Sequence, residues 1–162
     1  MKVLVTYSSK MGGTASLAEA VAKGIGEGAE VRPVDEVDSV SRYDAVVIGG
    51  GLYAGRWPRS GRHFVRRHAT ALQGRPVWFF SSGPLDDSAH DHEIEATHPV
   101  HKLMDKVGAR GHVTFGGRLP EDAQGFPASA MAKEMAGDWR HPEDALAWGE
   151  HLAAELSAEV GS

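Results

Sequence analysis

The sequence predicts an α/β protein with an open, doubly wound sheet of five parallel strands and helices on both faces. Two observations support this class. Short apolar runs alternate along the chain with segments whose apolar residues recur at helical spacing. The clearest run, residues 45–48, has no polar alternation, which is typical of a parallel strand covered on both faces. No internal repeat or linker divides the sequence, so we expect residues 1–160 to form one domain.

The first half of the chain supplies three strands and two helices. Strands are expected at residues 3–5, 29–34 and 43–49, and helices at residues 14–26 and 58–74. Gly26 and Gly28 should end the first helix, because glycine readily adopts the left-handed conformation found at helix ends. Pro33 indicates an edge strand, where a missing backbone donor is tolerated. Pro58 suits the first turn of the second helix.

The second half continues the alternation of strands and helices. Strands are expected at residues 77–80 and 112–115, and helices at residues 100–107 and from Pro142 onward. Trp148 lies on the apolar face of the last helix and is expected in the core. Between the last expected strand and the last expected helix, a polar connection leads to Trp139 and includes a weakly helical stretch at residues 128–135.

The loop after the first strand has the composition of an anion site. A strand that passes through glycine and hydroxyl residues into a helix brings free backbone N–H groups to the positive end of the helix dipole. The sequence is neither a dinucleotide fingerprint nor a Walker loop, since it lacks Gly-x-Gly-x-x-Gly and Lys10 precedes the glycines. The alternative is an ordinary turn in which Thr14 caps the helix.

Two further loops follow the third and fourth strands. Residues 49–58 hold three successive glycines together with Tyr53 and Trp57, and residues 81–85 are small or apolar. Ligands of open parallel sheets bind beyond the carboxyl ends of the strands, where the strand order reverses. We therefore expect the three loops to form one ligand site, in which glycines admit a flat ligand and an aromatic ring contacts it.

Composition limits the function classes. The chain has 162 residues, 41% hydrophobic residues and no cysteine, which suits one core and a reducing cytoplasm. Its net charge of −5 argues against nonspecific nucleic-acid binding. No apolar run approaches the ~18 residues of a membrane span, and no signal peptide is evident at the N-terminus. We expect a soluble, cytoplasmic protein without stable membrane insertion.

Two groups of side chains are open to more than one interpretation. The central arginines form either a solvated helix face or a collar for phosphates or an acidic substrate; they are Arg56, Arg59, Arg62, Arg66, Arg67 and Arg75. Residues 86–101 are polar and carry His90, His92, His98 and His101. His98 and His101 are spaced as metal ligands can be, but no ligand spacing repeats, so we expect a solvated loop and no metal site.

The three loops, taken together, resemble those of flavodoxins. Residues 7–14 resemble the phosphate loop, and residues 49–57 and 81–85 resemble the two loops that hold the isoalloxazine ring. Within this superfamily the chain resembles the flavodoxin-domain proteins that include menaquinone-dependent protoporphyrinogen oxidase. The blocks that carry this likeness, in order, lie at residues 53–57, 75–78, 80–85, 115–119 and 137–140. The resemblance implies a flavodoxin-like sheet with strand order 2-1-3-4-5.

The resemblance also implies FMN as the cofactor. Its phosphate would be held at Ser8, Ser9, Lys10, Met11, Gly12, Gly13 and Thr14. Its ring would lie between two loops, the first being Gly50, Gly51, Leu52, Tyr53, Ala54, Gly55 and Trp57, and the second Ser81, Ser82, Gly83, Pro84 and Leu85. Either Tyr53 or Trp57 would stack on the ring, and backbone groups at residues 51–54 would contact its reduced nitrogen.

Two departures affect the function that the resemblance implies. Met11 replaces a residue that is polar in many flavodoxins, and residues 120–136 are polar and alanine-rich where the membrane-associated porphyrinogen oxidases are more apolar and basic. We expect an FMN-dependent oxidoreductase with a small-molecule or protein redox partner, which includes a protoporphyrinogen oxidase-like activity. The alternatives are a one-electron carrier, a protein that binds deazaflavin F420 through its acidic tail, and a binding module without a flavin.

Overall fold

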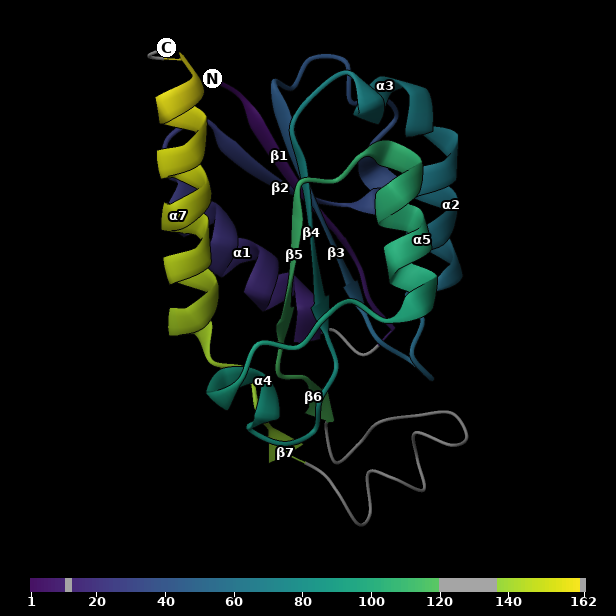
Figure 1. The fold of residues 1–162 in the computed structure, drawn as a ribbon, viewed down its shortest axis with the longest axis vertical. Helices are drawn as coiled ribbons and strands as arrows, with labels where there is room; N and C mark the ends of the chain where they lie inside the picture. The colour runs from purple at the N-terminus through teal and green to yellow at the C-terminus, as the bar shows by residue number, and fades with distance from the viewer. Residues whose placement is uncertain (11–12, 120–136, 161–162) are drawn as a thin grey trace.

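The computed structural model describes residues 1–10, 13–119 and 137–160, and its centre is a five-stranded parallel sheet (Figure 1). The strand order is β2-β1-β3-β4-β5, as expected for a flavodoxin-like fold. The strands are β1 (Val3–Ser8), β2 (Ala29–Pro33), β3 (Ala45–Gly51), β4 (Val77–Ser82) and β5 (Gly111–Phe115). All four neighbouring pairs are parallel, so the carboxyl ends of the five strands lie along one edge, and these include the three strand ends expected to carry the site.

Helices cover both faces of the sheet (Figure 1). One face packs against α1 (Gly13–Ile25) and α7 (Pro142–Val160), and the other against α2 (Arg59–Arg67), α3 (Ala69–Gln73) and α5 (His98–Val107). The shorter elements are the 3-10 helix η1 (Val34–Glu36), helix α4 (Ser88–Asp91), and an antiparallel pair, β6 (Arg118–Leu119) and β7 (Gly137–Asp138). None of the helices in the described ranges has both the length and the apolar character that a membrane span requires.

Most element boundaries agree with those expected from sequence. The first helix ends where Gly26 and Gly28 take positive φ angles of 94° and 95°, and α5 ends at Gly108 in the left-handed conformation. One expected helix is divided: residues 58–74 form α2 and α3, separated at His68, whose ψ of 13° is not helical. The stretch expected to be weakly helical, residues 128–135, lies outside the described residues.

Helices α1 and α7 pack at very short range because a glycine occupies each side of their contact. A Cβ on Gly24 would lie 2.2 Å from the carbonyl oxygen of Leu146, and a Cβ on Gly149 would lie 2.2 Å from that of Val21. No side chain fits in either place. The contact holds the C-terminal helix against the first helix and fixes the face of the sheet on which both lie.

The end of β3 is shaped by aromatic rings of the core. A Cβ on Gly49 would lie 2.0 Å from the ring of Phe80, and one on Gly50 would lie 2.3 Å from the indole of Trp57. These glycines therefore make room for core side chains on opposite faces of the sheet. The indole occupies the space on the side-chain side of Gly50, so contact of a flat ligand with the backbone of these glycines stays a prediction.

This close packing predicts the effect of adding one methyl group. We expect Gly50→Ala to lower the free energy of unfolding by about 1–3 kcal/mol, because the new Cβ overlaps the buried indole. Gly74→Ala is the matched control, since its Cβ would lie 3.7 Å from its nearest neighbour, the Ala71 carbonyl oxygen. Urea unfolding measures both changes, and equal losses in the two variants would contradict the role assigned to Gly50.

Candidate functional site

The ends of β1, β3 and β4 lie side by side, in agreement with the flavodoxin-like strand order. Ser8 is paired with Gly50, which in turn is paired with Ser81, and Gly51 is paired with Ser82. Because successive residues of a strand point to opposite faces, each loop delivers neighbouring side chains to different layers of the molecule. The site is therefore best described one face at a time.

On the α1 face, three hydroxyl groups surround Gly51. A Cβ on Gly51 would lie 3.1 Å from Thr14 Oγ1, 3.6 Å from Ser9 Oγ and 3.9 Å from Ser82 Oγ. Thr14 Oγ1 and Ser82 Oγ are themselves 3.1 Å apart and buried. Since Thr14 lies in the first turn of α1, these hydroxyls surround the positive end of a 13-residue helix. This arrangement suits an anionic group such as a phosphate.

On the α2 face, the expected hydroxyls serve the core. The Oγ atoms of Ser8 and Ser60 are 2.6 Å apart, and Ser81 Oγ accepts a 3.0 Å hydrogen bond from Trp57 Nε1. Both Ser8 and Ser81 are buried. Their side chains therefore belong to the packing beneath the loops, and only Ser9, Thr14 and Ser82 gather at the start of α1.

Of the two aromatic candidates for stacking, the structure places one in the core. Trp57 is 1% exposed and packs against Phe79 with ring centroids 4.8 Å apart. Stacking on a ligand requires an open ring face, so the expectation for Trp57 does not hold in this structure. Tyr53 is partly exposed, and the Lys10 ammonium group lies 4.9 Å from its ring centroid. Lys10 thereby links the loop after β1 to the aromatic ring of the loop after β3.

Tyr53 begins a tight turn that is held from several sides. Tyr53 and Arg56 exchange backbone hydrogen bonds of 2.8 and 3.1 Å, and Ala54 and Gly55 between them have φ angles of 50° and 77°. These angles are typical of a type I′ turn. Thr97 Oγ1 donates a 2.7 Å bond to the Gly55 carbonyl. The residues just before α5 therefore fix this turn, hereafter the Tyr53 turn.

The third loop is fixed through its backbone. Leu52 N donates to Ser82 O at 2.7 Å, and the Leu52 side chain packs where a Cβ on Gly83 would lie. Gly83 N donates to Phe115 O, and Pro84 O accepts from Gly117 N. The N–H groups of Leu52 and Tyr53 are thus used within the protein, and the contact of backbone groups at residues 51–54 with a flavin nitrogen stays a prediction. Met11 and Gly12, expected in the phosphate loop, lie outside the described residues.

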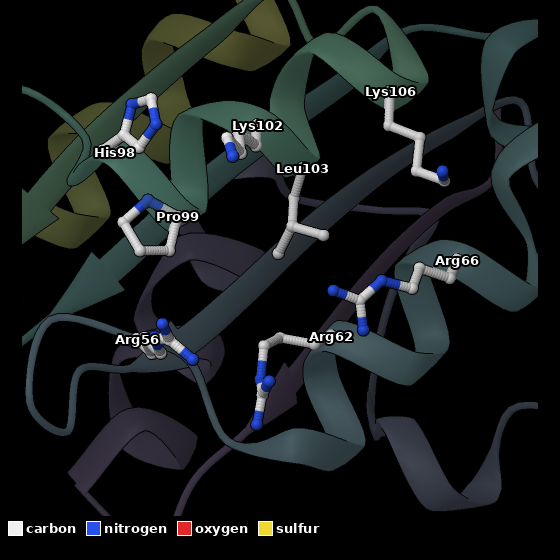
Figure 2. A pocket seen from close by; sticks show the side chains of 8 residues that line it. All are labelled: Arg56, Arg62, Arg66, His98, Pro99, Lys102, Leu103 and Lys106. Carbon is white, nitrogen blue, oxygen red and sulfur yellow. The ribbon is translucent and has the colours of Figure 1, made fainter.

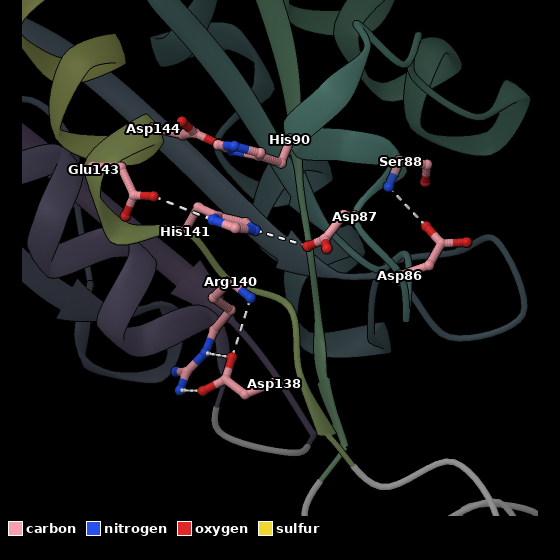
Figure 3. A network of polar contacts seen from close by, with 9 residues as sticks. All are labelled: Asp86, Asp87, Ser88, His90, Asp138, Arg140, His141, Glu143 and Asp144. Carbon is pink, nitrogen blue, oxygen red and sulfur yellow. Dashed lines mark hydrogen bonds and ion pairs between the residues drawn. The ribbon is translucent and has the colours of Figure 1, made fainter.

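An arginine that the sequence analysis missed borders the start of α1. Arg140 Nη1 donates to the Gly13 carbonyl at 3.3 Å and to the Ser16 hydroxyl. Asp138 orients this guanidinium, and the hydrogen bond from Arg140 lowers the pKa of the Asp138 carboxyl (Figure 3). Arg118 lies close by, with its Cβ 3.3 Å from the position of a Cβ on Gly13. The only sequence signal was the block at residues 137–140, which suggested no role.

A second cluster joins α4 to the start of α7 (Figure 3). The rings of His90 and His141 are stacked with centroids 3.8 Å apart. His90 lies 2.7 Å from Asp144, and His141 lies 2.8 Å from Asp87 and 3.1 Å from Glu143. The hydrogen bond to Asp87 raises the pKa of His141. Carboxylates therefore hold both imidazoles, the exposed ring of His90 and the partly buried ring of His141, and these contacts connect α4 to the start of α7.

Metal-ligand spacing in the sequence pointed to other histidines. His98 lines a groove beside α2, whereas His101 pairs with Asp105 at 3.3 Å. The potential ligand atoms that do approach one another belong to His90, His141 and Glu143, within 4.8 Å. His90 and His141 are 51 positions apart in the sequence, so spacing could not reveal their contact.

His112 on β5 extends the buried contacts of Trp57. Its Nε2 lies 2.9 Å from Ser81 Oγ, and its Nδ1 is buried without a hydrogen-bond partner among the described residues. Burial lowers the pKa of His112 to about 4. The ring is therefore neutral near pH 7. The hydrogen bonds from Trp57 through Ser81 to His112 connect the loop after β3 with β4 and β5.

Comparison with known proteins gives a consistent result. The family profile of the flavodoxin domain matches residues 4–136. Protoporphyrinogen IX dehydrogenase [quinone] of Escherichia coli strain K12 is 34% identical over 86 residues, which span 50% of this chain and 48% of that protein. The chain thus matches about half the length of this relative.

Solved structures share the fold at low sequence identity. A flavodoxin from an archaeon has a TM-score of 0.65 and 16% identity, covering 97% of this chain and 99% of that one. Two-electron reduced flavodoxin of Megasphaera elsdenii has a TM-score of 0.64 and 18% identity, covering 94% and 98%. Rubredoxin oxygen:oxidoreductase of Desulfovibrio gigas has a TM-score of 0.67 and 12% identity, covering 99% of this chain and 37% of its own.

The burial of His112 predicts a pH dependence of stability. Its pKa is about 4 in the folded chain and 6.5 when unperturbed. Between these pH values His112 is protonated in the unfolded chain but neutral in the folded chain. The stability that depends on this difference is therefore fully present above pH 6.5 and is lost as the pH falls toward 4. Between pH 7 and pH 4 we expect the free energy of unfolding to fall by up to about 3 kcal/mol more in the wild type than in His112→Gln, which lacks the titrating ring. Urea unfolding at both pH values tests this, and parallel losses would contradict it.

Proposed function

Because the chain belongs to the flavodoxin-domain family, we propose that it is a soluble FMN-binding oxidoreductase that transfers electrons through a non-covalently held flavin. The observation that carries this proposal is the gathering of Thr14, Ser9 and Ser82 around Gly51 at the start of α1. A side chain at residue 51 would fill the space between these hydroxyls. Glycine leaves it open to a phosphate oxygen.

The phosphate of FMN fits this position for two reasons. Hydroxyl groups from two places converge there: Ser9 and Thr14 come from the β1–α1 connection and the first turn of α1, and Ser82 from the end of β4. Helix α1 begins beside them, and the backbone N–H groups of a helix's first turn have no partner within the helix. Arg140 supports the same turn by hydrogen-bonding the Gly13 carbonyl and the Ser16 hydroxyl. The chain thus supplies donors, a helix dipole and a fixed loop, which together suit a dianionic group.

The flavin ring would lie against the Tyr53 turn and the loop at residues 83–85. Tyr53 offers the partly exposed aromatic ring, while the buried Trp57 stabilises the loop through its hydrogen bond to Ser81. Lys10 covers one side of the Tyr53 ring, so ring binding uses the other side or displaces this side chain. When bound, FMN supplies the electron-transfer chemistry, and the protein binds and orients it. Backbone hydrogen bonds that fix both loops keep this surface in place.

We propose a protoporphyrinogen oxidase-like activity as the finer function. Its support is the partial match to the Escherichia coli dehydrogenase, which the name of that protein links to protoporphyrinogen IX and a quinone. The match covers 48% of that protein, so the activity of the present chain needs its own assay. If that assay finds no activity, the alternative function of an electron carrier is favoured.

Cofactor binding can be tested by removing one hydroxyl. We expect the purified chain to retain FMN with a two-band flavin spectrum, and not to retain F420. Thr14→Val should weaken FMN binding at least about tenfold, because a hydrogen bond to a charged phosphate is lost without changing side-chain shape. The matched control is Thr70→Val, because Thr70 is an exposed residue of α3. Unchanged affinity of the Thr14 variant would place the phosphate elsewhere.

Enzymatic activity can be tested with the substrate named for the relative. The FMN-loaded protein, mixed with protoporphyrinogen IX and a soluble quinone, should produce porphyrin fluorescence at least tenfold faster than free FMN at equal concentration. Thr14→Val at limiting FMN should lose this rate in proportion to its lost flavin. A loaded protein no faster than free FMN would reject this activity and favour an electron carrier.

A further inference from the structure

We propose that the groove between α2 and α5 is a binding site for a small molecule that carries several phosphate or carboxylate groups. The groove has a volume of about 360 Å³, and cationic or imidazole side chains dominate its lining. The lining residues are Arg56, Arg62, Arg66, His98, Lys102 and Lys106, with Pro99 and Leu103 (Figure 2). This proposal concerns a surface outside the flavin site and does not depend on flavin binding.

The arginine and lysine side chains of the two helices, together with His98, form two facing rows (Figure 2). Arg62 and Arg66 are four residues apart on α2, and His98, Lys102 and Lys106 repeat at the same spacing on α5. Residues four apart share one face of a helix, so each helix presents its row to the groove. Leu103, which is 5% exposed, lies between the rows and gives the groove an apolar floor.

This concentration of positive charge is not neutralised within the described part of the chain. None of the groove's arginines or lysines forms an ion pair with a described carboxylate, whereas Arg32, Arg42, Arg110 and Arg140 each do. Helix α2 contains four arginines and no acidic residue. Like charges four residues apart on a helix repel each other. An anion held between the rows would relieve this repulsion on both helices.

The size and shape of the groove favour a small molecule over a protein surface. Pockets that bind small ligands have volumes of roughly 300–1,000 Å³, and this groove lies at the lower end of that range. Arginine forks bind phosphate and carboxylate oxygens in pairs, and lysines add point charges. Arg56 belongs to both the groove lining and the Tyr53 turn, so an anion in the groove would lie next to that turn.

Titration of the full chain with pyrophosphate and, separately, citrate tests the proposal by calorimetry at low ionic strength. The double variant Arg66→Gln/Lys102→Gln removes one charge from each row, and we expect it to weaken binding at least tenfold. The matched control is Arg59→Gln/Arg67→Gln, which removes two exposed α2 charges outside the groove and should change affinity less than twofold. A second variant, Lys102→Gln/Lys106→Gln, keeps the test available if the first fails to fold.

Each outcome decides between defined ligands. Tighter binding of pyrophosphate than of citrate, lost only in the groove variants, supports a phosphate ligand, and the opposite order supports a carboxylate. Equal weakening in groove and control variants overturns the proposal, because attraction would then be diffuse. Absence of binding to wild type also overturns it. A third titration uses polyglutamate, and binding of polyglutamate alone, with the same variant dependence, overturns the small-molecule proposal in favour of an acidic polypeptide.

Discussion

The packing of Trp57 over Gly50 fixes the arrangement of the ligand-facing edge of this protein. The indole fills the space that a side chain at residue 50 would need, and its Nε1 donates to Ser81 on the next strand. Pro58 follows immediately and leads into α2, so the direction of that helix depends on where the indole is held. The Tyr53 turn precedes it. One buried ring therefore positions both the Tyr53 turn, against which we propose that the flavin lies, and one wall of the groove between α2 and α5.

The layered fold could be predicted largely from the sequence. Residues 45–48 are apolar throughout because β3 is buried on both faces, and Gly26 and Gly108 marked helix ends through the same left-handed conformation they adopt. The order of the strands came from the resemblance to flavodoxins rather than from periodicity. The break at His68 was missed, since the apolar spacing continues across it.

Side-chain directions at the strand ends could not be predicted. Gly50 and Gly51, and likewise Ser81 and Ser82, are chemically alike but point to opposite faces of the sheet. An alternating polar pattern would have shown which residue faces which layer, but these loops are small or hydroxylic throughout. As a result, the expected site combined hydroxyls near the start of α1 with others that serve the core. The contact of Arg140 with Gly13 was equally hidden, because it joins distant segments.

The Arg140 contact also has a consequence for the order in which the site is completed. Arg140 hydrogen-bonds the Gly13 carbonyl across 127 residues of chain. During synthesis on a ribosome, the residues that begin α1 emerge long before Arg140 has been made. The contacts between the loop before α1 and the segment before α7 can therefore form only after that later segment has been made. A cofactor held at this loop would therefore meet its final surroundings only after the chain has been made as far as Arg140.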